Sequence, residues 1–198
     1  MITPVILASG SASRRALLEG AGVDSTAIKP DLDEESYKVS MRADGLAIAD
    51  QAMRLAELKA EKVSREQSGL VIGGDQMLAL GERAFDKPKD LEDARRHLND
   101  LSGKAHTLET AIAVAEGGTT IWRHHAQPRL TMRGLSPSFI EKYLHEVGPE
   151  ICNTVGGYQL EGLGSQLFSR IEGDYFSILG LPLLPLLDYL RTRGVLET

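Results

Sequence analysis

The residues best suited to chemistry lie at the end of one apolar run. Leu70–Ile72 is a short apolar segment typical of a buried strand, and it leads directly into residues 73–76, Gly-Gly-Asp-Gln. A strand that delivers a carboxylate to its end is a common arrangement in the active sites of α/β proteins. Aspartate is also frequent in turns, where it bonds to the local backbone. Asp75 is therefore a candidate catalytic carboxylate, and a simple turn residue is the alternative interpretation.

A second source of carboxylates is the acidic segment 31–35, Asp-Leu-Asp-Glu-Glu. Hard divalent ions such as Mg²⁺ are held in proteins by one or two carboxylates together with the phosphates of a substrate. The segment would supply a second carboxylate to an ion bound by Asp75. The alternative is a solvated run of charge that binds nothing.

A basic cluster is predicted near the amino terminus, where Arg14 and Arg15 fall in the opening turn of a helix. The positive end of the helix dipole disfavours cations by a few tenths of a kcal/mol each, and a bound anion would reverse this effect. Free backbone N–H groups, two guanidinium groups and three hydroxyls would together hold a triphosphate. The hydroxyls are those of Ser9, Ser11 and Ser13. A solvated pair of arginines is the alternative.

Other polar residues give weaker signals. Lys59 lies beside the apolar face of a predicted helix, whereas Lys87-Pro88 has the composition of a turn. The glycine-rich segment 156–164 would allow close approach to a ligand, but glycines also serve any irregular loop. His124 and His125 are neighbours in a predicted strand and point to opposite faces, so we leave them out of the site.

The supporting elements follow from periodicity and punctuation. We expect strands at 5–8, 107–114 and 119–132, and two short strands around residues 172–174. The strand that begins at 70–72 should continue through 77–80 into a hairpin towards Phe85. The residues predicted to form helices run from Ser11 to near Gly22, from the acidic loop to Val63, from Leu91 to Leu101, from Pro137 to Val147, and onward from Pro182. The long second helix should bury a face formed by Leu46, Ala49, Met53, Ala56, Ala60 and Val63. Hairpins among strand-helix units favour a mixed sheet and the α/β class.

Composition sets the limits of the function. The chain has 198 residues, 42% hydrophobic and 25% charged, which is typical of a soluble globular protein and predicts one domain over residues 1–198. A formal net charge of −6 argues against a nucleic-acid scaffold, although a small anion needs only a local basic cluster. Cys152 is alone and forms no intramolecular disulfide. With no leader or membrane span expected, we predict a cytoplasmic protein.

Taken together, these motifs resemble the Maf family of nucleoside triphosphate pyrophosphatases, also called septum formation proteins. The resemblance covers nearly the whole chain, and eight motifs occur in the family's order. They are LASGSASRRALLEGAGV at 7–23, DLDEE at 31–35, RLAELKA at 54–60, GGDQ at 73–76, DKP at 86–88, LSG at 101–103, YQLEGLG at 158–164, and IEGDYFSILGLPL at 171–183.

The resemblance implies a cytoplasmic, often dimeric enzyme with two lobes around a cleft. Such an enzyme cleaves a nucleoside triphosphate between its α and β phosphates with Mg²⁺ or a similar ion such as Mn²⁺ or Co²⁺. It implies a catalytic role for Asp75 and for the motif lysines Lys59 and Lys87, and metal binding by Asp75 and Glu34. Ser9 and the paired arginines Arg14 and Arg15 match the family's substrate-binding residues.

Two branches of the family differ at three positions. One branch prefers dTTP and UTP, and the other is associated with 7-methyl-GTP. Ser13, Gln76 and Glu161 are similar to the second branch, although Ser13 replaces a tryptophan that some of its members carry. The resemblance therefore implies hydrolysis of nucleoside triphosphates, including modified ones such as 7-methyl-GTP. The alternatives are a nucleotide-binding regulator of cell division without turnover, and a phosphatase that releases orthophosphate.

Overall fold

The computed structural model describes residues 3–197, which form two compact units. Unit 1 consists of residues 1–76, 110–126 and 174–198, and unit 2 consists of residues 77–109 and 127–173. Two long strands, β3 (Leu70–Leu80) and β5 (Ala105–Glu116), begin in one unit and end in the other. The single domain over 1–198 and the cleft between two lobes stay predictions, and residues 1–2 and 198 lie outside the described part.

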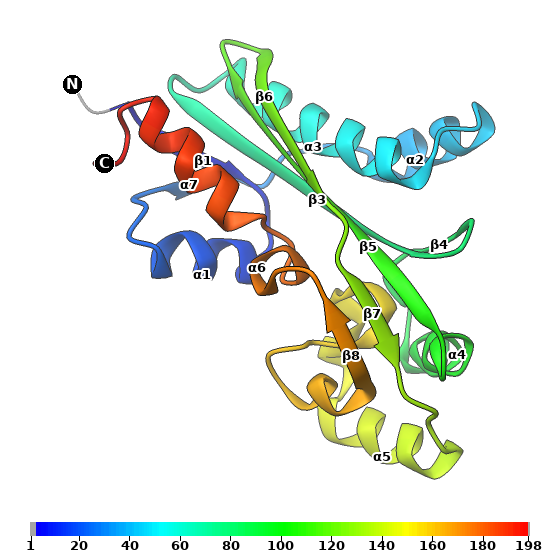
Figure 1. Cartoon of the computed structure of the whole chain (residues 1–198). Helices are drawn as coiled ribbons and strands as arrows, with labels where there is room; N and C mark the ends of the chain where they lie inside the picture. Colours follow the sequence, from blue (N-terminus) through cyan, green and yellow to red (C-terminus); the bar gives the residue numbers. More distant parts are fainter. Residues whose placement is uncertain (1–2, 198) are drawn as a thin grey trace. The chain divides into compact units, whose positions relative to one another are not determined.

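Unit 1 has a mixed sheet covered by helices (Figure 1). Strand β1 is parallel to β2 and to β3, β3 neighbours β5, and β5 is antiparallel to β6. The mixed α/β fold is thus confirmed. Besides parts of β3 and β5, the elements are β1 (Val5–Ala8), α1 (Ala12–Gly20), β2 (Thr26–Ala27), α2 (Glu34–Ala43), α3 (Ile48–Ser64), β6 (Thr119–Ala126), α6 (Tyr175–Ile178) and α7 (Leu183–Thr192).

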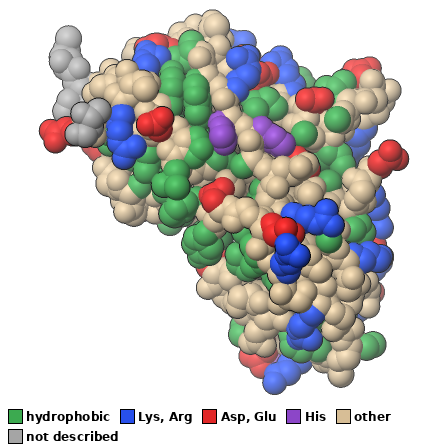
Figure 2. Space-filling view, in the orientation of Figure 1, with side chains coloured by type: hydrophobic (Ala, Val, Ile, Leu, Met, Phe, Trp, Pro, Cys, Tyr) green, Lys and Arg blue, Asp and Glu red, His purple; other side chains and the backbone are tan. Residues whose placement is uncertain are grey.

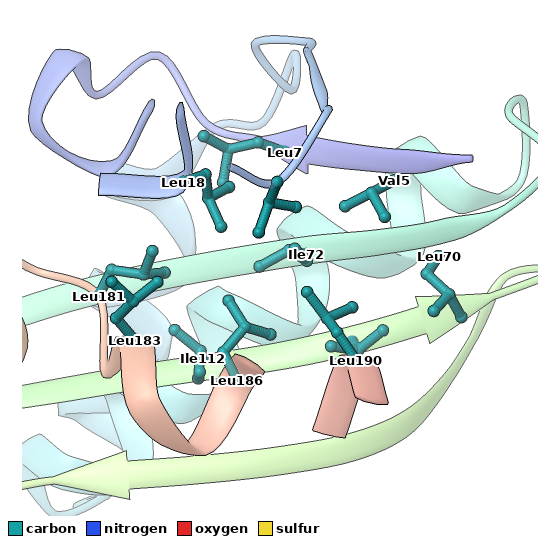
Figure 3. Close-up of a cluster of buried hydrophobic side chains, with 12 residues drawn as sticks. Val5, Leu7, Leu18, Leu70, Ile72, Ile112, Leu181, Leu183, Leu186 and Leu190 are labelled. Atoms are coloured by element: carbon teal, nitrogen blue, oxygen red, sulfur yellow. The ribbon is translucent and has the colours of Figure 1, made fainter. Parts of the chain in front are cut away.

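The two faces of this sheet are covered by different helices, because alternate side chains of a strand point to opposite sides. On one face, strand residues such as Leu7 and Ile72 pack with Leu18 of α1 and with Leu186 and Leu190 of α7, as Figure 3 shows. On the other face, residues such as Ile6 and Val71 pack against Ala60 and Val63 of α3. A residue of β3 therefore faces either α1 and α7 or α3, according to its place in the alternation.

The contact between α3 and β3 depends on Gly73. A Cβ atom built at this residue would lie 2.1 Å from the carbonyl oxygen of Ala56 and 2.7 Å from the backbone nitrogen of Ala60. Both distances are shorter than any real Cβ contact, so only glycine permits the helix backbone to lie so close to the strand. The glycine is used here for space, since its φ is not positive.

Unit 2 has antiparallel pairing throughout. Strand β4 pairs with β3, β7 pairs with the start of β5, and β8 pairs with β7. Its own elements are β4 (Arg83–Phe85), α4 (Leu91–Leu101), β7 (Arg129–Met132), α5 (Pro137–Val147), 3-10 turns at Pro149–Asn153, Val155–Gly157 and Leu163–Leu167, and β8 (Phe168–Glu172). The side chains of Asp90 and Ser136 cap α4 and α5, whose bounds agree with the predicted helices.

The acidic segment and the helix after it differ from our prediction. Glu34 begins a separate helix, α2, whose amino end is capped by the side chain of Asp33. The chain turns at Gly45, which has a φ of 72°, before α3 begins at Ile48. The predicted long helix is therefore two helices, and the predicted loop is partly helical because Asp33 is a good N-cap and carboxylates stabilise the first turn.

The predicted buried face of that helix is also partly wrong. Leu46 precedes α3 and is 37% exposed, and Ala49 and Met53 are only half-buried. The buried residues include Ala52, Leu55, Ala56, Lys59, Ala60 and Val63. A polar side chain, Lys59, therefore occupies the centre of the face that packs on the sheet.

Three strand predictions are corrected as well. Asp75 does not end its strand, because β3 runs without interruption from Leu70 to Leu80 and contains it. The single strand predicted over 119–132 is two strands, because residues 127 and 128 interrupt it and β7 then pairs with the opposite end of β5. Pro128 has no N–H to donate to a sheet ladder. Only the first of the strands predicted around residues 172–174 exists, as β8. The second is the helix α6, whose N-cap Asp174 accepts a hydrogen bond from the backbone nitrogen of Ser177.

The surface carries both signs of charge. On the face shown in Figure 2, acidic and basic side chains are interspersed, with hydrophobic side chains among them. Within residues 3–197, no helix has the length and apolar character needed to cross a bilayer.

Candidate functional site

The first part of the site is the turn between β1 and α1. Ser9 directly follows β1 and is only 7% exposed. Its Oγ accepts hydrogen bonds from the backbone nitrogen of Ser11 at 3.1 Å and from Nη1 of Arg14 at 3.3 Å. Ser11 caps α1, because its side chain accepts a hydrogen bond from the backbone nitrogen of Arg14. Ser11 therefore fixes the start of the helix, and Ser9 fixes Arg14.

Arg14 is held across the top of this turn. Its Nε donates to the carbonyl oxygen of Gly180 at 2.7 Å, and its Nη1 donates to that of Gly74 at 2.9 Å. Burial lowers the pKa of Arg14, while the charges of Asp75 and Glu34 act in the opposite direction. A Cβ atom at Gly74 would lie 3.2 Å from the guanidinium Nε, so this glycine leaves room for the side chain.

Arg15 has a different environment from its neighbour. Its side chain is 57% exposed and lies 3.7 Å from the carboxylate of Glu19, one helical turn further on. Such an exposed pair contributes little to stability. The solvated interpretation fits the position of Arg15, whereas Arg14 is built into the site. Ser13, between Ser11 and Arg14 in the first turn of α1, is half-buried.

The second part of the site is a cluster of charged side chains formed by Glu34, Lys59 and Asp75, which we call the charged cluster. Nζ of Lys59 lies 2.6 Å from Oδ1 of Asp75 and 2.9 Å from Oε2 of Glu34. The side chains of Lys59 and Asp75 are 7% and 9% exposed, and that of Glu34 is 41% exposed. The carboxylates of Glu34 in α2 and Asp75 in β3 thus meet at the ammonium group of Lys59 in α3.

Gln76 comes directly after Asp75 but faces the other side of the sheet. Its Nε2 contacts Oγ1 of Thr110 at 2.8 Å and the carbonyl oxygens of Ser177 and Ile178 at 3.0 and 3.1 Å. Asp75 therefore belongs to the α3 side of the strand, and Gln76 belongs to the side covered by α6.

The donor set fits a hard divalent cation that is completed by a bound ligand. Mg²⁺ needs only one or two protein carboxylates when phosphate oxygens and water fill its remaining positions. Asp75 and Glu34 supply two carboxylates on the same ammonium group, with Lys59 as their present counter-charge. Among residues 3–197, no group of three or more His, Cys, Asp or Glu side chains could hold a metal without such a ligand.

The remaining predicted residues belong to unit 2. Lys87 is exposed, and it lies after β4 in the loop that ends at the N-cap Asp90. Glu161 is exposed in the turn that precedes the last 3-10 helix of that unit. Within unit 1, the structure brings together five predicted residues: Ser9, Arg14, Glu34, Lys59 and Asp75.

Three contributors were missed by the sequence analysis. Gly180 supplies the carbonyl that holds Arg14, and Thr110 and Ser177 contact the amide of Gln76. Gly180 lies in the IEGDYFSILGLPL motif and has a φ of 97°, so its conformation favours glycine. Thr110 and Ser177 gave no individual signal, because a hydroxyl in a strand or a short helix is common.

Comparisons with known proteins identify the family of the chain. Residues 4–193 match the family model described as Maf-like protein. A "Nucleoside triphosphate pyrophosphatase" of Hyphomonas neptunium is 64% identical over 198 residues, and the match covers 100% of both chains. One of the same name from Rhodospirillum rubrum is 50% identical and covers 99% of this chain and 98% of its own. A "7-methyl-GTP pyrophosphatase" of Mesorhizobium japonicum is 48% identical, again over 100% of both chains.

Proposed function

The chain belongs to the Maf-like protein family, and from this membership we propose that it hydrolyses nucleoside triphosphates to the monophosphate and pyrophosphate. The observation that carries the proposal is the charged cluster, in which a buried lysine holds two carboxylates beside the turn that positions Arg14. The names of the full-length relatives support the same reaction.

The roles of the residues follow from their chemistry. Arg14 is a permanent cation at the start of α1, where backbone N–H groups also favour an anion, so it neutralises the phosphates of the substrate. Ser9 orients the guanidinium, and we place Arg15 at the outer edge of the same phosphate site. Lys59 is a point charge held by both carboxylates, and we propose that it contacts the phosphates when these arrive. Lys87 of unit 2 is proposed as a second catalytic lysine.

Asp75 and Glu34 are the residues that would hold a divalent cation, with Mg²⁺ as the first candidate and Mn²⁺ or Co²⁺ as alternatives. When bound, the cation supplies positive charge to the phosphate oxygens. Asp75 has two roles open to it: it binds the ion, or it accepts a proton from the water that attacks the α phosphorus. Either role needs the negative charge of the carboxylate.

We extend the proposal to the substrate base and to the state of the protein. Ser13, Gln76 and Glu161 favour the 7-methyl-GTP branch. Relatives of 46–64% identity include proteins named nucleoside triphosphate pyrophosphatase and proteins named 7-methyl-GTP pyrophosphatase. We also propose a homodimer that resides in the cytoplasm and binds no nucleic acid or membrane. The net charge of −6 supports the last point, because nucleic acids and anionic lipids attract basic surfaces.

One assay separates the proposal from its alternatives. Purified protein is incubated with Mg²⁺ and a panel of nucleotides, and both pyrophosphate and orthophosphate are measured. Pyrophosphate with an equal amount of monophosphate supports the proposal. Orthophosphate would instead indicate a phosphatase. Binding without any product would indicate a regulator without turnover.

The base preference has its own test in Glu161. A carboxylate accepts hydrogen bonds only, so it pairs with the amino and ring N–H donors of guanine, whereas glutamine also donates to uracil or thymine. We expect Glu161→Gln, alone or with Gln76→Thr, to move kcat/KM towards UTP and dTTP. The expected shift is about tenfold, since an unmatched polar group costs on the order of 1–3 kcal/mol. An unchanged ranking would remove these positions from base selection.

A further inference from the structure

The side-chain amide of Gln76 is surrounded on its nitrogen side by three oxygen atoms. Oγ1 of Thr110 lies at 2.8 Å, and the carbonyl oxygens of Ser177 and Ile178 lie at 3.0 and 3.1 Å. An amide nitrogen has only two hydrogens to donate. The nitrogen is therefore fully engaged by the protein itself.

The direction of these hydrogen bonds is fixed by chemistry. Backbone carbonyls only accept, so the atom of Gln76 that faces Ser177 and Ile178 must be the nitrogen and not the oxygen. The hydroxyl of Thr110 donates its own hydrogen to the carbonyl of Ser177 at 3.0 Å. Thr110 thus has only a lone pair left for Gln76. All three neighbours are acceptors, and a flipped amide would place its oxygen against them.

The surroundings make this orientation rigid. Thr110 and Ser177 are both 0% exposed. Ser177 lies in α6, whose first turn is fixed by the N-cap Asp174. Gln76 is half-buried and directly follows Asp75 on β3. An acceptor network of this kind is therefore formed before any ligand binds.

We propose that Thr110 is a positioning residue for base selection: it takes up one N–H group of Gln76 while the carbonyls of the consecutive residues Ser177 and Ile178 share the other, so that Gln76 offers a nucleobase only its acceptor oxygen. This inference rests on the proposed function and deepens it. Gln76 then favours a base edge that carries an amino group or a ring N–H, and it disfavours an edge that carries only oxygen or ring-nitrogen acceptors at that point.

The test uses three variants of the full chain and four nucleotides. Thr110→Val keeps the shape of the side chain but removes the hydroxyl, and Thr110→Ser restores it. Thr120→Val is the matched control, because Thr120 lies in the same unit but donates its hydroxyl to Glu61. Release of pyrophosphate from GTP, 7-methyl-GTP, ITP and purine riboside triphosphate gives kcat/KM for each protein, and the purine of the last nucleotide carries only ring-nitrogen acceptors on its edge.

In wild type we expect the nucleotides to differ, and in Thr110→Val we expect the spread between the best and the worst to shrink by about threefold to tenfold, the value of one hydrogen bond. Thr110→Ser and Thr120→Val should keep the wild-type spread. An equal loss for all four nucleotides in Thr110→Val, or an unchanged spread, would show that Thr110 has only a structural role and would overturn the inference.

A second measurement does not depend on turnover. NMR of the free protein should show both side-chain amide hydrogens of Gln76 protected from solvent exchange, with faster exchange in Thr110→Val. Unprotected hydrogens in wild type would overturn the inference while leaving the proposed function intact. If wild type releases no pyrophosphate from any nucleotide, the proposed function fails first, and this role of Thr110 fails with it.

Discussion

Two buried polar groups of this molecule differ in kind. The charged cluster of unit 1 contains Glu34, Lys59 and Asp75. Unit 2 contains a neutral pair, in which Nε2 of His106 lies 2.8 Å from the hydroxyl of Tyr158. His106 and Tyr158 are 2% and 5% exposed, and Tyr158 also packs edge to face on Phe168.

The difference in charge between the two groups indicates which of them stabilises the fold and which takes part in chemistry. Burying charges costs several kcal/mol, and an ion pair only partly offsets this cost, so a buried ion pair is weak evidence for stability. A neutral pair with one hydrogen bond and aromatic packing has no such cost. Burial lowers the pKa of His106 to about 4, which keeps the pair neutral near pH 7. We therefore expect the charged cluster to serve activity and the neutral pair to serve stability.

The largest effect should come from Asp75→Asn. We expect pyrophosphate release to fall by about a thousandfold, because the variant removes a charge that acts at the reacting centre. The fold should persist, as judged by circular dichroism. Asp100→Asn is the control, since Asp100 pairs with the exposed Arg83 in unit 2. Activity near that of wild type in folded Asp75→Asn would remove Asp75 from catalysis.

Removing the lysine should reduce stability. Lys59→Met leaves two carboxylates without their counter-charge, and we expect the free energy of unfolding in urea to fall by about 3 kcal/mol. This is the lower end of the range for a buried pair, because Glu34 is partly exposed. The double variant with Asp75→Asn should regain most of this stability but no activity. A double variant as unstable as Lys59→Met would show that the cluster stabilises the fold.

The neutral pair should make stability depend on pH. Unfolded histidine binds a proton below about pH 6.5, but folded His106 does so only near pH 4. The unfolded state thus binds more protons between these values, and stability is lost as pH falls from 6.5 to 4. His106→Gln cannot take up a proton. Between pH 7 and pH 4.5 it should lose on the order of 2 kcal/mol less stability than wild type. Equal losses would mean that His106 is protonated in the folded protein.

Variants of Arg14 and Arg15 test which of the two arginines belongs to the phosphate site. Arg14→Ala should weaken binding of a non-hydrolysable triphosphate by about tenfold, the value of a hydrogen bond to a charged group. Arg15→Ala should weaken it by less than about threefold, because its side chain is exposed and screened. Calorimetry measures both. Equal losses would mean that Arg15 turns inward when the nucleotide binds, and no loss in either variant would refute the phosphate site.

Much of this site was predictable because its signals are local. The apolar run before Asp75, the serines around the start of α1 and the order of the motifs gave the fold class and the family, and both are confirmed. The same local signals predicted the bounds of α4 and α5. Strand β1 and helices α1, α4 and α5 were placed within a few residues of their observed ends.

What could not be predicted depends on contacts between distant segments. The sequence placed Lys59 beside an apolar helix face, but it gave no sign that the side chain is buried against Asp75, because lysine is usually solvated. The carbonyl of Gly180, which holds Arg14 from 166 positions away, is invisible in a sequence. Helix α2 was missed although Asp33 and the glutamates after it are good start signals, because the whole segment was interpreted as a metal-binding loop.

The two glycines before Asp75 also bear on how the enzyme could be re-engineered. Position 73 is limited by the backbone of α3, and position 74 by the guanidinium of Arg14. A mutant library that aims at new substrates should therefore keep both glycines fixed. A side chain at position 73 would collide with the backbone of α3, and one at position 74 would displace the guanidinium of Arg14. The diversity belongs first at positions 13 and 161, which are half-buried and exposed, because Gln76 and Thr110 are bonded to α6.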